Sequence, residues 1–225
     1  MTGIFDSGAG GLAALSELRR LLPKEDIIFL CDKENAPYGT KSDTDIAAIA
    51  EGNIKRLINA GASRVLIACC TASALYGRLS DYVRSASVPI IAPAAKYATE
   101  VSKSGRIAVI ATNLTVSLGA FDKAIRACEN GARVTQIPAQ ELVEIAEKTA
   151  HGMPIESKES RYIENLADEI LKTDTDTLVL GCTHFSHLKD GIKKLLGNVN
   201  IVDSAVLGAR AVAAYSGGEG RTVLL

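Results

Sequence analysis

The chain has 225 residues, of which 47% are hydrophobic and 23% are charged. Its formal net charge is −1, so nothing in the charge balance favours nucleic acid or an anionic membrane as a partner. No apolar run approaches the length of a membrane span. The start, MTGIFDSGAGG, lacks the features of a signal peptide, so we expect a cytoplasmic protein whose five cysteines are free thiols.

The first part of the chain alternates short apolar runs, typical of buried strands, with amphipathic helical runs. Pro23 ends the first helix, and Ser42 with Asp45 resembles a capping box at the start of the second. In chain order the expected elements are a strand over 2–6, a helix over 12–22, a strand over 27–31, a helix over 42–61, a strand over 65–68, a helix to about Arg84, and a strand over 88–92 interrupted by Pro89.

The same alternation continues to the end of the chain. The expected elements are a strand over 107–111, a helix over 116–128, a strand over 133–137, helices over 140–149 and 159–171, a strand over 177–180, a helix over 187–196, a strand over 200–202 and a helix over 205–215. The last residues, SGGEGRTVLL, fit either a loose tail or an edge strand. The pattern predicts an α/β fold with parallel sheets that carry helices on both faces.

Two stretches share one pattern: Val65–Ser73 (VLIACCTAS) and Thr177–Ser186 (TLVLGCTHFS) each end an apolar run with a cysteine and hydroxyl residues. Ligands bind at the carboxyl ends of such strands, so we expect Cys69 and Cys182 to face each other across one cleft. Two thiols on opposite faces of a stereocentre could remove a proton and return one, which is racemisation without a cofactor. The alternative is that both are small buried hydrophobes.

Polar residues at other strand ends could hold a substrate. Asp6 is expected to cap the first helix, and Ser7 with the following glycine amides could bind a carboxylate. The loop Pro37–Thr40 could bind a second carboxylate through its backbone amides. Thr112 and Thr115 offer hydroxyls at the strand end of the second half.

Cys182, His184 and His187 spell C-x-H-x-x-H, which could be part of a metal site. A zinc site needs a fourth ligand or an open position, and the sequence has no CxxC pair and no second histidine cluster. We therefore expect no metal, and interpret His184 as a proton partner of one thiol.

These residues resemble the glutamate racemases, cofactor-independent enzymes of peptidoglycan synthesis. The matching segments are IFDSGAGGL, RRLLP, APYGTKS, the TASA after Cys69 and Cys70, the segment from Ala111, and GCTHF around Cys182. They occur in order over almost the whole chain. The resemblance implies two similar doubly wound domains related by a pseudo-twofold axis, residues 1–93 with 203–225 and residues 94–202, with the active site between them.

The resemblance also implies roles for individual residues. Cys69 and Cys182 would be the two acid/base groups, with Asp6 and His184 as their proton partners. The expected substrate-binding residues are Asp6, Ser7, Tyr38, Gly39, Cys70, Thr71, Thr112, Thr115, Thr183 and His184. The substrate would be an amino acid, and the reaction would need no metal, pyridoxal phosphate or nucleotide. The enzyme could be a homodimer.

Cys70 departs from the family pattern, because glutamate racemases normally carry asparagine directly after the first cysteine. A thiol is a weaker donor and acceptor than a carboxamide. Three functions are therefore compared: a racemase of glutamate, a racemase of another small amino acid such as aspartate, and a non-catalytic homologue. A decarboxylase of the same superfamily needs only one cysteine, so the presence of both thiols speaks against it.

Overall fold

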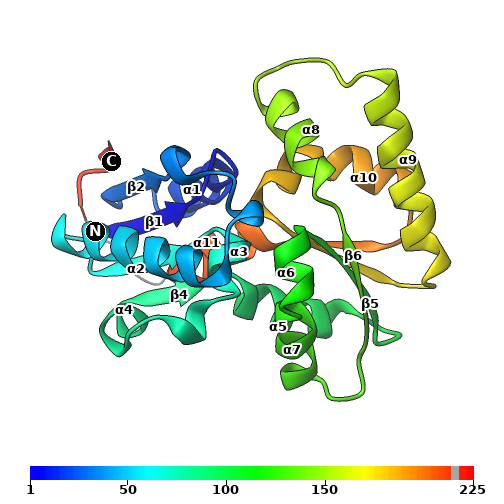
Figure 1. Ribbon diagram of the computed structural model, residues 1–225, viewed down its shortest axis with the longest axis horizontal. Helices are drawn as coiled ribbons and strands as arrows, with labels where there is room; N and C mark the ends of the chain where they lie inside the picture. Colours follow the sequence, from blue (N-terminus) through cyan, green and yellow to red (C-terminus); the bar gives the residue numbers. More distant parts are fainter. Residues whose placement is uncertain (214–217) are drawn as a thin grey trace.

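The computed structural model describes residues 1–213 and 218–225, and within these ranges the strands form two sheets in which all neighbours run parallel (Figure 1). The first sheet has the order β4-β3-β1-β2-β9 and the second β6-β5-β7-β8. The strands are β1 (Thr2–Asp6), β2 (Ile27–Cys31), β3 (Arg64–Ile67), β4 (Ser87–Pro89), β5 (Arg106–Ala111), β6 (Arg133–Pro138), β7 (Thr177–Gly181), β8 (Asn200–Asp203) and β9 (Thr222–Leu224).

The two sheets share one topology. When β5 to β8 are matched in chain order to β1 to β4, the strand order is the same in both sheets. In each sheet the second strand lies on one side of the first strand, and the third and fourth strands lie on its other side. Strand β9 is an addition to the edge of the first sheet. Cys69 follows β3 and Cys182 follows β7, so the two cysteines occupy equivalent places. The expected α/β class with two parallel sheets is confirmed.

Helices cover both faces of each sheet. Between the sheets lie α1 (Gly11–Leu21), α5 (Ile91–Val101), α7 (Ala120–Cys128) and α11 (Ser204–Val212). The outer face of the first sheet carries α2 (Asp43–Asn59) and α4 (Asp81–Ser85), and that of the second carries α8 (Glu141–Ala150), α9 (Ser157–Lys172) and α10 (Lys189–Leu196). Among the described residues, none of the helices has the length and apolar content to cross a bilayer.

Alternate strand residues enter different cores. On β1, Ile4 belongs to the core between the sheets and Phe5 to the outer core of the first sheet. On β5, Val109 faces the shared core and Ile110 the outer core of the second sheet. Strands buried on both faces need continuous apolar runs, which is why the central positions of these two strands are apolar.

Three expected helices differ from the observed ones, two by an interruption and one by a later start. The helix expected over 116–128 is split into α6 (Asn113–Ser117) and α7, because Gly119 adopts a φ of 61°. The helix expected to end near Arg84 is split into α3 (Cys70–Ser73), a 3₁₀ turn and α4, which starts afresh from a Ser80 cap. The helix expected over 187–196 is preceded by a 3₁₀ segment, Thr183–Leu188.

The expectation for residues 88–92 is wrong beyond β4. That strand ends at Pro89, and α5, which the sequence analysis missed, begins at Ile91 with Pro93 in its first turn. Proline is tolerated there because the first helical N–H groups have no intrahelical partner. The proline-rich segment therefore starts a helix.

The C-terminal residues form an edge strand, the second of the two expected alternatives. Strand β9 pairs with β2, and Arg221 donates to the carboxylate of Asp26 at 2.9 Å. Arg19 adds hydrogen bonds to the Arg221 carbonyl and the Thr222 hydroxyl. The expected end of the last helix at Tyr215 lies outside the described residues.

Two glycines provide a matched test of the conclusion that the positive φ of Gly119 breaks the helix. Gly119 lies at positive φ, so Gly119→Ala should lower the free energy of unfolding by about 1 kcal/mol. Gly52 is an exposed interior residue of α2 with open space around its Cα, so Gly52→Ala should raise it by about 0.5–1 kcal/mol. Urea unfolding of both variants measures the two signs, and equal signs would contradict the assignment of Gly119 as a strained helix break.

Candidate active site

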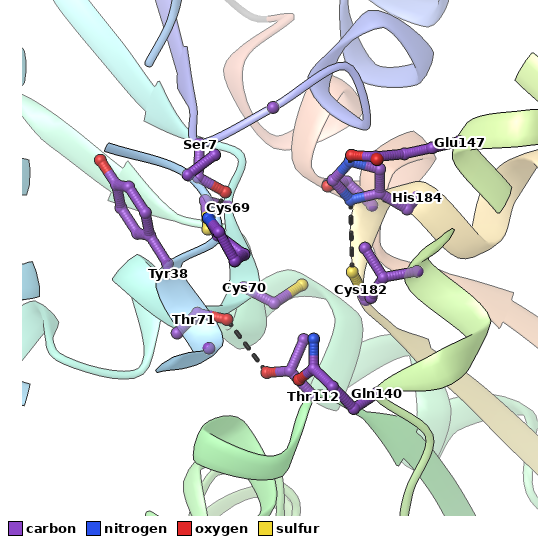
Figure 2. Close-up of a pocket in the computed structure, with 16 residues that line it drawn as sticks. Ser7, Tyr38, Cys69, Cys70, Thr71, Thr112, Gln140, Glu147, Cys182 and His184 are labelled. Carbon is purple, nitrogen blue, oxygen red and sulfur yellow. Dashed lines mark hydrogen bonds and ion pairs between the residues drawn. The ribbon is translucent and has the colours of Figure 1, made fainter. Parts of the chain in front are cut away.

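One pocket lies where the carboxyl ends of β1 and β3 meet that of β7 (Figure 2). Its cavity volume is about 60 Å³, which is small for a small-ligand site. Asp6 and Thr115 lie behind its wall. The sequence-predicted residues that line it are Ser7, Tyr38, Gly39, Cys69, Cys70, Thr71, Thr112, Cys182, Thr183 and His184.

Cys69 lies on the side of the first sheet. Its thiol is buried, and its Sγ lies 3.2 Å from Ser7 Oγ, with which it shares a hydrogen bond. The fully buried carboxylate of Asp6 is close enough to raise the pKa of Cys69. One thiol therefore has a hydroxyl and a carboxylate beside it.

Cys182 lies on the opposite side of the pocket, as Figure 2 shows. Its Sγ lies 3.6 Å from Nδ1 of His184. The other ring nitrogen, Nε2, lies 3.2 Å from Oε1 of Glu147, although the pair lacks the alignment of a hydrogen bond. The second thiol thus has an imidazole beside it and a carboxylate behind the imidazole.

Hydrogen bonds join the two sides behind the pocket wall. Thr183 Oγ1 donates to Oδ2 of Asp6 at 3.0 Å, and the Gly8 N–H donates to Oδ1 of the same carboxylate at 2.8 Å. Asp6 therefore does not cap α1 as expected, since the N-cap is Gly10. A Cβ on Gly10 would lie 2.7 Å from the backbone nitrogen of His184, so only glycine allows this approach.

Three threonine hydroxyls cluster at another point of contact between the halves. Thr71 Oγ1 lies 3.1 Å from Thr112 Oγ1 and 3.3 Å from Thr115 Oγ1, and the last two are 2.9 Å apart. Thr112 also caps α6 by accepting from the backbone N–H of Thr115. Of the three, Thr71 and Thr112 line the pocket, and Thr115 supports them from behind.

Cys70 contributes a third buried thiol to the pocket. Figure 2 shows its sulfur directed between Cys69 and Cys182. Its Sγ lies 3.5 Å from Ser204 Oγ, and that hydroxyl donates to the carbonyl of Leu180 at 2.6 Å. The sequence analysis did not identify Ser204, because nothing in the sequence links it to Cys70.

The Tyr38 hydroxyl forms a buried hydrogen bond within the protein. It donates to Oδ2 of Asp32 at 2.7 Å, and Asn53 donates to the same oxygen at 2.7 Å. This buried group anchors the loop that follows β2. The Tyr38–Gly39 part of that loop lines the pocket.

Four residues of the pocket wall were not expected from the sequence. They are Ala36, Gln140, Val143 and Glu147. Gln140 lies between the end of β6 and the start of α8, and Glu147 lies within α8. Val143 lies three residues after Gln140 and four before Glu147, so all three share one helical face. This spacing was the signal in the sequence that could have grouped them.

The C-x-H-x-x-H segment does not bring its residues together as ligands. No group of three or more Cys, His, Asp or Glu side chains able to hold a metal is found among residues 1–213 and 218–225. Burial and the neighbouring His184 lower the pKa of His187, which is half-buried outside the pocket lining.

Burial dominates the protonation of the thiols. It raises the pKa of Cys69 to about 11, with the Asp6 carboxylate adding to the effect and the Ser7 hydrogen bond opposing it. Burial also raises the pKa of Cys182 and of Cys70. Burial raises the pKa of Asp6 too, against the nearby His184 and the hydrogen bonds from Gly8 and Thr183. Both facing thiols are therefore protonated at neutral pH before a ligand binds.

Comparison with known proteins gives consistent matches. The model of the family described as Asp/Glu/Hydantoin racemase matches residues 11–212. The glutamate racemase of Desulforudis audaxviator is 37% identical over 212 residues, which cover 93% of this chain and 76% of that protein. The glutamate racemase of Deinococcus radiodurans is also 37% identical, over 92% of this chain and 72% of that protein.

Solved structures agree with the sequence matches. The glutamate racemase isoform RacE1 of Bacillus anthracis superposes with a TM-score of 0.87 at 28% identity, covering 100% of this chain and 86% of that one. The Francisella tularensis glutamate racemase, solved in complex with D-glutamate, gives a TM-score of 0.84 at 25% identity, covering 99% of this chain and 86% of that one.

The raised thiol pKa values predict slow alkylation. At pH 7 only about one Cys69 in ten thousand is a thiolate, given a pKa of about 11, and the thiolate fraction rises about tenfold per pH unit. Iodoacetamide should therefore label the exposed Cys128 first, and labelling of Cys69 should increase steeply from pH 7 to pH 9. Peptide mass spectrometry measures both rates. Rapid labelling of Cys69 at pH 7 would show that its thiolate already exists at rest.

Proposed function

Because the chain belongs to the Asp/Glu/hydantoin racemase family, we propose that it interconverts L-glutamate and D-glutamate without a cofactor and so supplies D-glutamate for peptidoglycan. The named relatives and solved structures at 25–37% identity are glutamate racemases, which supports glutamate over other amino acids. The aspartate racemase of Picrophilus torridus is 19% identical and supports the fold alone.

The observation that carries the proposal is the placement of Cys69 and Cys182. They follow equivalent strands of two sheets with the same order, and they line opposite sides of one pocket. A substrate bound between them would present one face of its Cα to each sulfur. This is the geometry that a two-base racemisation needs, and a single-cysteine enzyme has no use for it.

Proton transfer would proceed with the two thiols in opposite states. In one direction the Cys69 thiolate takes the α-proton, the electron pair of the C–H bond stays on Cα as a carbanion, and the Cys182 thiol gives its proton to the opposite face. The product is the other enantiomer, and the enzyme is left with a Cys69 thiol and a Cys182 thiolate. The reverse reaction begins from that state, so the roles alternate.

Each thiol has a partner that could take its proton before the chemical step. Asp6 is placed to do this for Cys69, with Ser7 bonded to the sulfur at 3.2 Å. His184 is placed to do it for Cys182, and Glu147 can balance the charge of the imidazolium that forms. At a pKa of about 11, forming the Cys69 thiolate at pH 7 costs about 5 kcal/mol, so a proton acceptor at this point is valuable.

The groups around the pocket suit a zwitterionic dicarboxylate. None of its described lining residues is Lys or Arg. Carboxylates would be bound by neutral donors, namely the hydroxyls of Ser7, Thr71 and Thr112 and the backbone amides around Gly39. The ammonium would be attracted by Asp6 and Glu147, which lie at the two thiol sides.

We further infer that residues 1–93 with 203–225, and residues 94–202, act as two domains around the pocket. The two sheets support this, because β1 to β4 and β9 lie in the first set of residues and β5 to β8 lie almost entirely in the second. A homodimer and a cytoplasmic location stay predictions, which light scattering and fractionation of the native host can test.

Replacing either of the two facing thiols should remove most of the racemase activity. Cys69→Ser and Cys182→Ser should each lower kcat for racemisation by several orders of magnitude, because the serine hydroxyl is a far weaker acid than a thiol and its alkoxide is scarcely formed near neutral pH. Polarimetry measures turnover, and exchange of the α-hydrogen in deuterated water measures proton abstraction. Cys128→Ser, at an exposed site, is the matched control. A wild type that exchanges no α-hydrogen of any amino acid would instead favour the non-catalytic alternative.

Substitutions of Cys70 test whether glutamate is the substrate. An asparagine at this position would offer a strong donor and acceptor to a bound amino acid, so Cys70→Asn should lower KM for glutamate by about tenfold to a hundredfold. Cys70→Ser is the control for removing sulfur without adding an amide. If Cys70→Asn abolishes the activity, the native substrate is not held as glutamate is, and a screen of other small amino acids by deuterium exchange should identify it.

A further inference from the structure

Gln140 closes one end of the pocket and has no part in the proton chemistry described above. It is the N-cap residue of α8, with helical backbone angles, and it lines the pocket together with Gly39, Thr112 and Cys182. Its side chain therefore extends from the second half of the molecule toward the loop after β2. A carboxamide in such a place can donate and accept hydrogen bonds at once.

One hydrogen bond fixes the orientation of this carboxamide. The backbone N–H of Asn113 donates to Oε1 of Gln140 at 3.3 Å. An N–H group needs an acceptor, so the oxygen must face Asn113 and the amide nitrogen must face the other way. Figure 2 shows that nitrogen directed into the pocket, toward Cys70 and Cys182.

The carboxamide is also held from the opposite side of the pocket. A Cβ on Gly39 would lie 2.8 Å from Oε1 of Gln140 and 3.4 Å from its Nε2, so the flat group lies against the bare Cα of that glycine. A side chain larger than hydrogen at position 39 would displace it. The Gln140 amide is thus preorganised between α6 and the loop after β2, which lowers the entropy lost when a ligand binds.

The donors of this amide have no protein partner among the described side chains. Within residues 1–213 and 218–225, leaving aside the Thr40 side chain, no hydrogen bond from Gln140 Nε2 to the protein is found. The same pocket has no Lys or Arg among its described lining residues. An amide N–H₂ that faces such a space is a ready donor for an anionic group of the ligand.

We propose that Gln140 is a substrate-recognition residue whose amide nitrogen donates a hydrogen bond to a carboxylate of a dicarboxylic amino acid. The inference rests on the proposed racemase function and deepens it, because it names a contact that favours dicarboxylates over monocarboxylates. Gln140 binds the substrate equally before and during proton transfer, so its removal should affect KM and leave kcat nearly unchanged.

Two substitutions of similar size test the contact. Gln140→Met removes the donor, and Gln140→Glu removes it and places a negative charge against the substrate carboxylate. We expect KM for glutamate to rise by about tenfold in the first and more in the second, with kcat within about threefold of wild type. Asn130→Asp makes the same amide-to-carboxylate change at an exposed site and should leave both constants unchanged.

Binding of glutarate, measured by calorimetry, gives a readout that does not depend on turnover, and its Kd should rise in the same order. Unchanged KM and Kd in Gln140→Glu, with an active wild type, would overturn this inference and leave the proposed function standing. A fall in kcat at constant KM would also overturn it, since Gln140 would then only shape the pocket. A wild type without turnover or glutarate binding would overturn both proposals.

Discussion

The apolar core shared by the two sheets is the constraint on which the site depends. Ile4 and Leu66 of the first sheet and Val109 and Val179 of the second belong to this one core, together with the helices between them. Because β3 and β7 both contribute residues to it, this core positions the residues just beyond their carboxyl ends relative to each other. The hydrogen bond from Thr183 to Asp6 and the Thr71–Thr112 contact then close the halves around the pocket.

Burial makes the chemistry possible and difficult at once. A dry pocket raises the pKa of the Cys69 thiol to about 11, so its thiolate, once formed, is a stronger base than an exposed one. The same burial makes that thiolate costly to form. In the proposed mechanism, Asp6 and His184 would reconcile the two requirements, since each lies near one thiol and inside the same desolvated region. The titratable groups would then lie where protons move, and the neutral donors where carboxylates would bind.

The sequence predicted the strands and the two thiols well because both follow from local patterns. Doubly buried strands need unbroken apolar runs, and a cysteine after such a run lies at a sheet edge. It failed where tertiary contacts decide. Gly119 breaks a helix whose apolar spacing continues through it, and the strand expected over 88–92 ends at Pro89, two residues before α5 begins at Ile91. Gln140 and Glu147 could not be placed, because only the packing of α8 against the rim brings them to the pocket.

Cys70 shows how a contact on the far side of the pocket determines what a residue presents to a ligand. The Ser204 hydroxyl hydrogen is committed to the Leu180 carbonyl at 2.6 Å, so its oxygen can only accept from Cys70. The thiol hydrogen then points to Ser204, and the sulfur lone pairs are left to face the pocket. Sulfur is a weak acceptor and suits the ammonium of an amino acid better than a carboxylate. With Cys70 turned in this way, recognition of a substrate carboxylate would fall to the hydroxyls and amides around it.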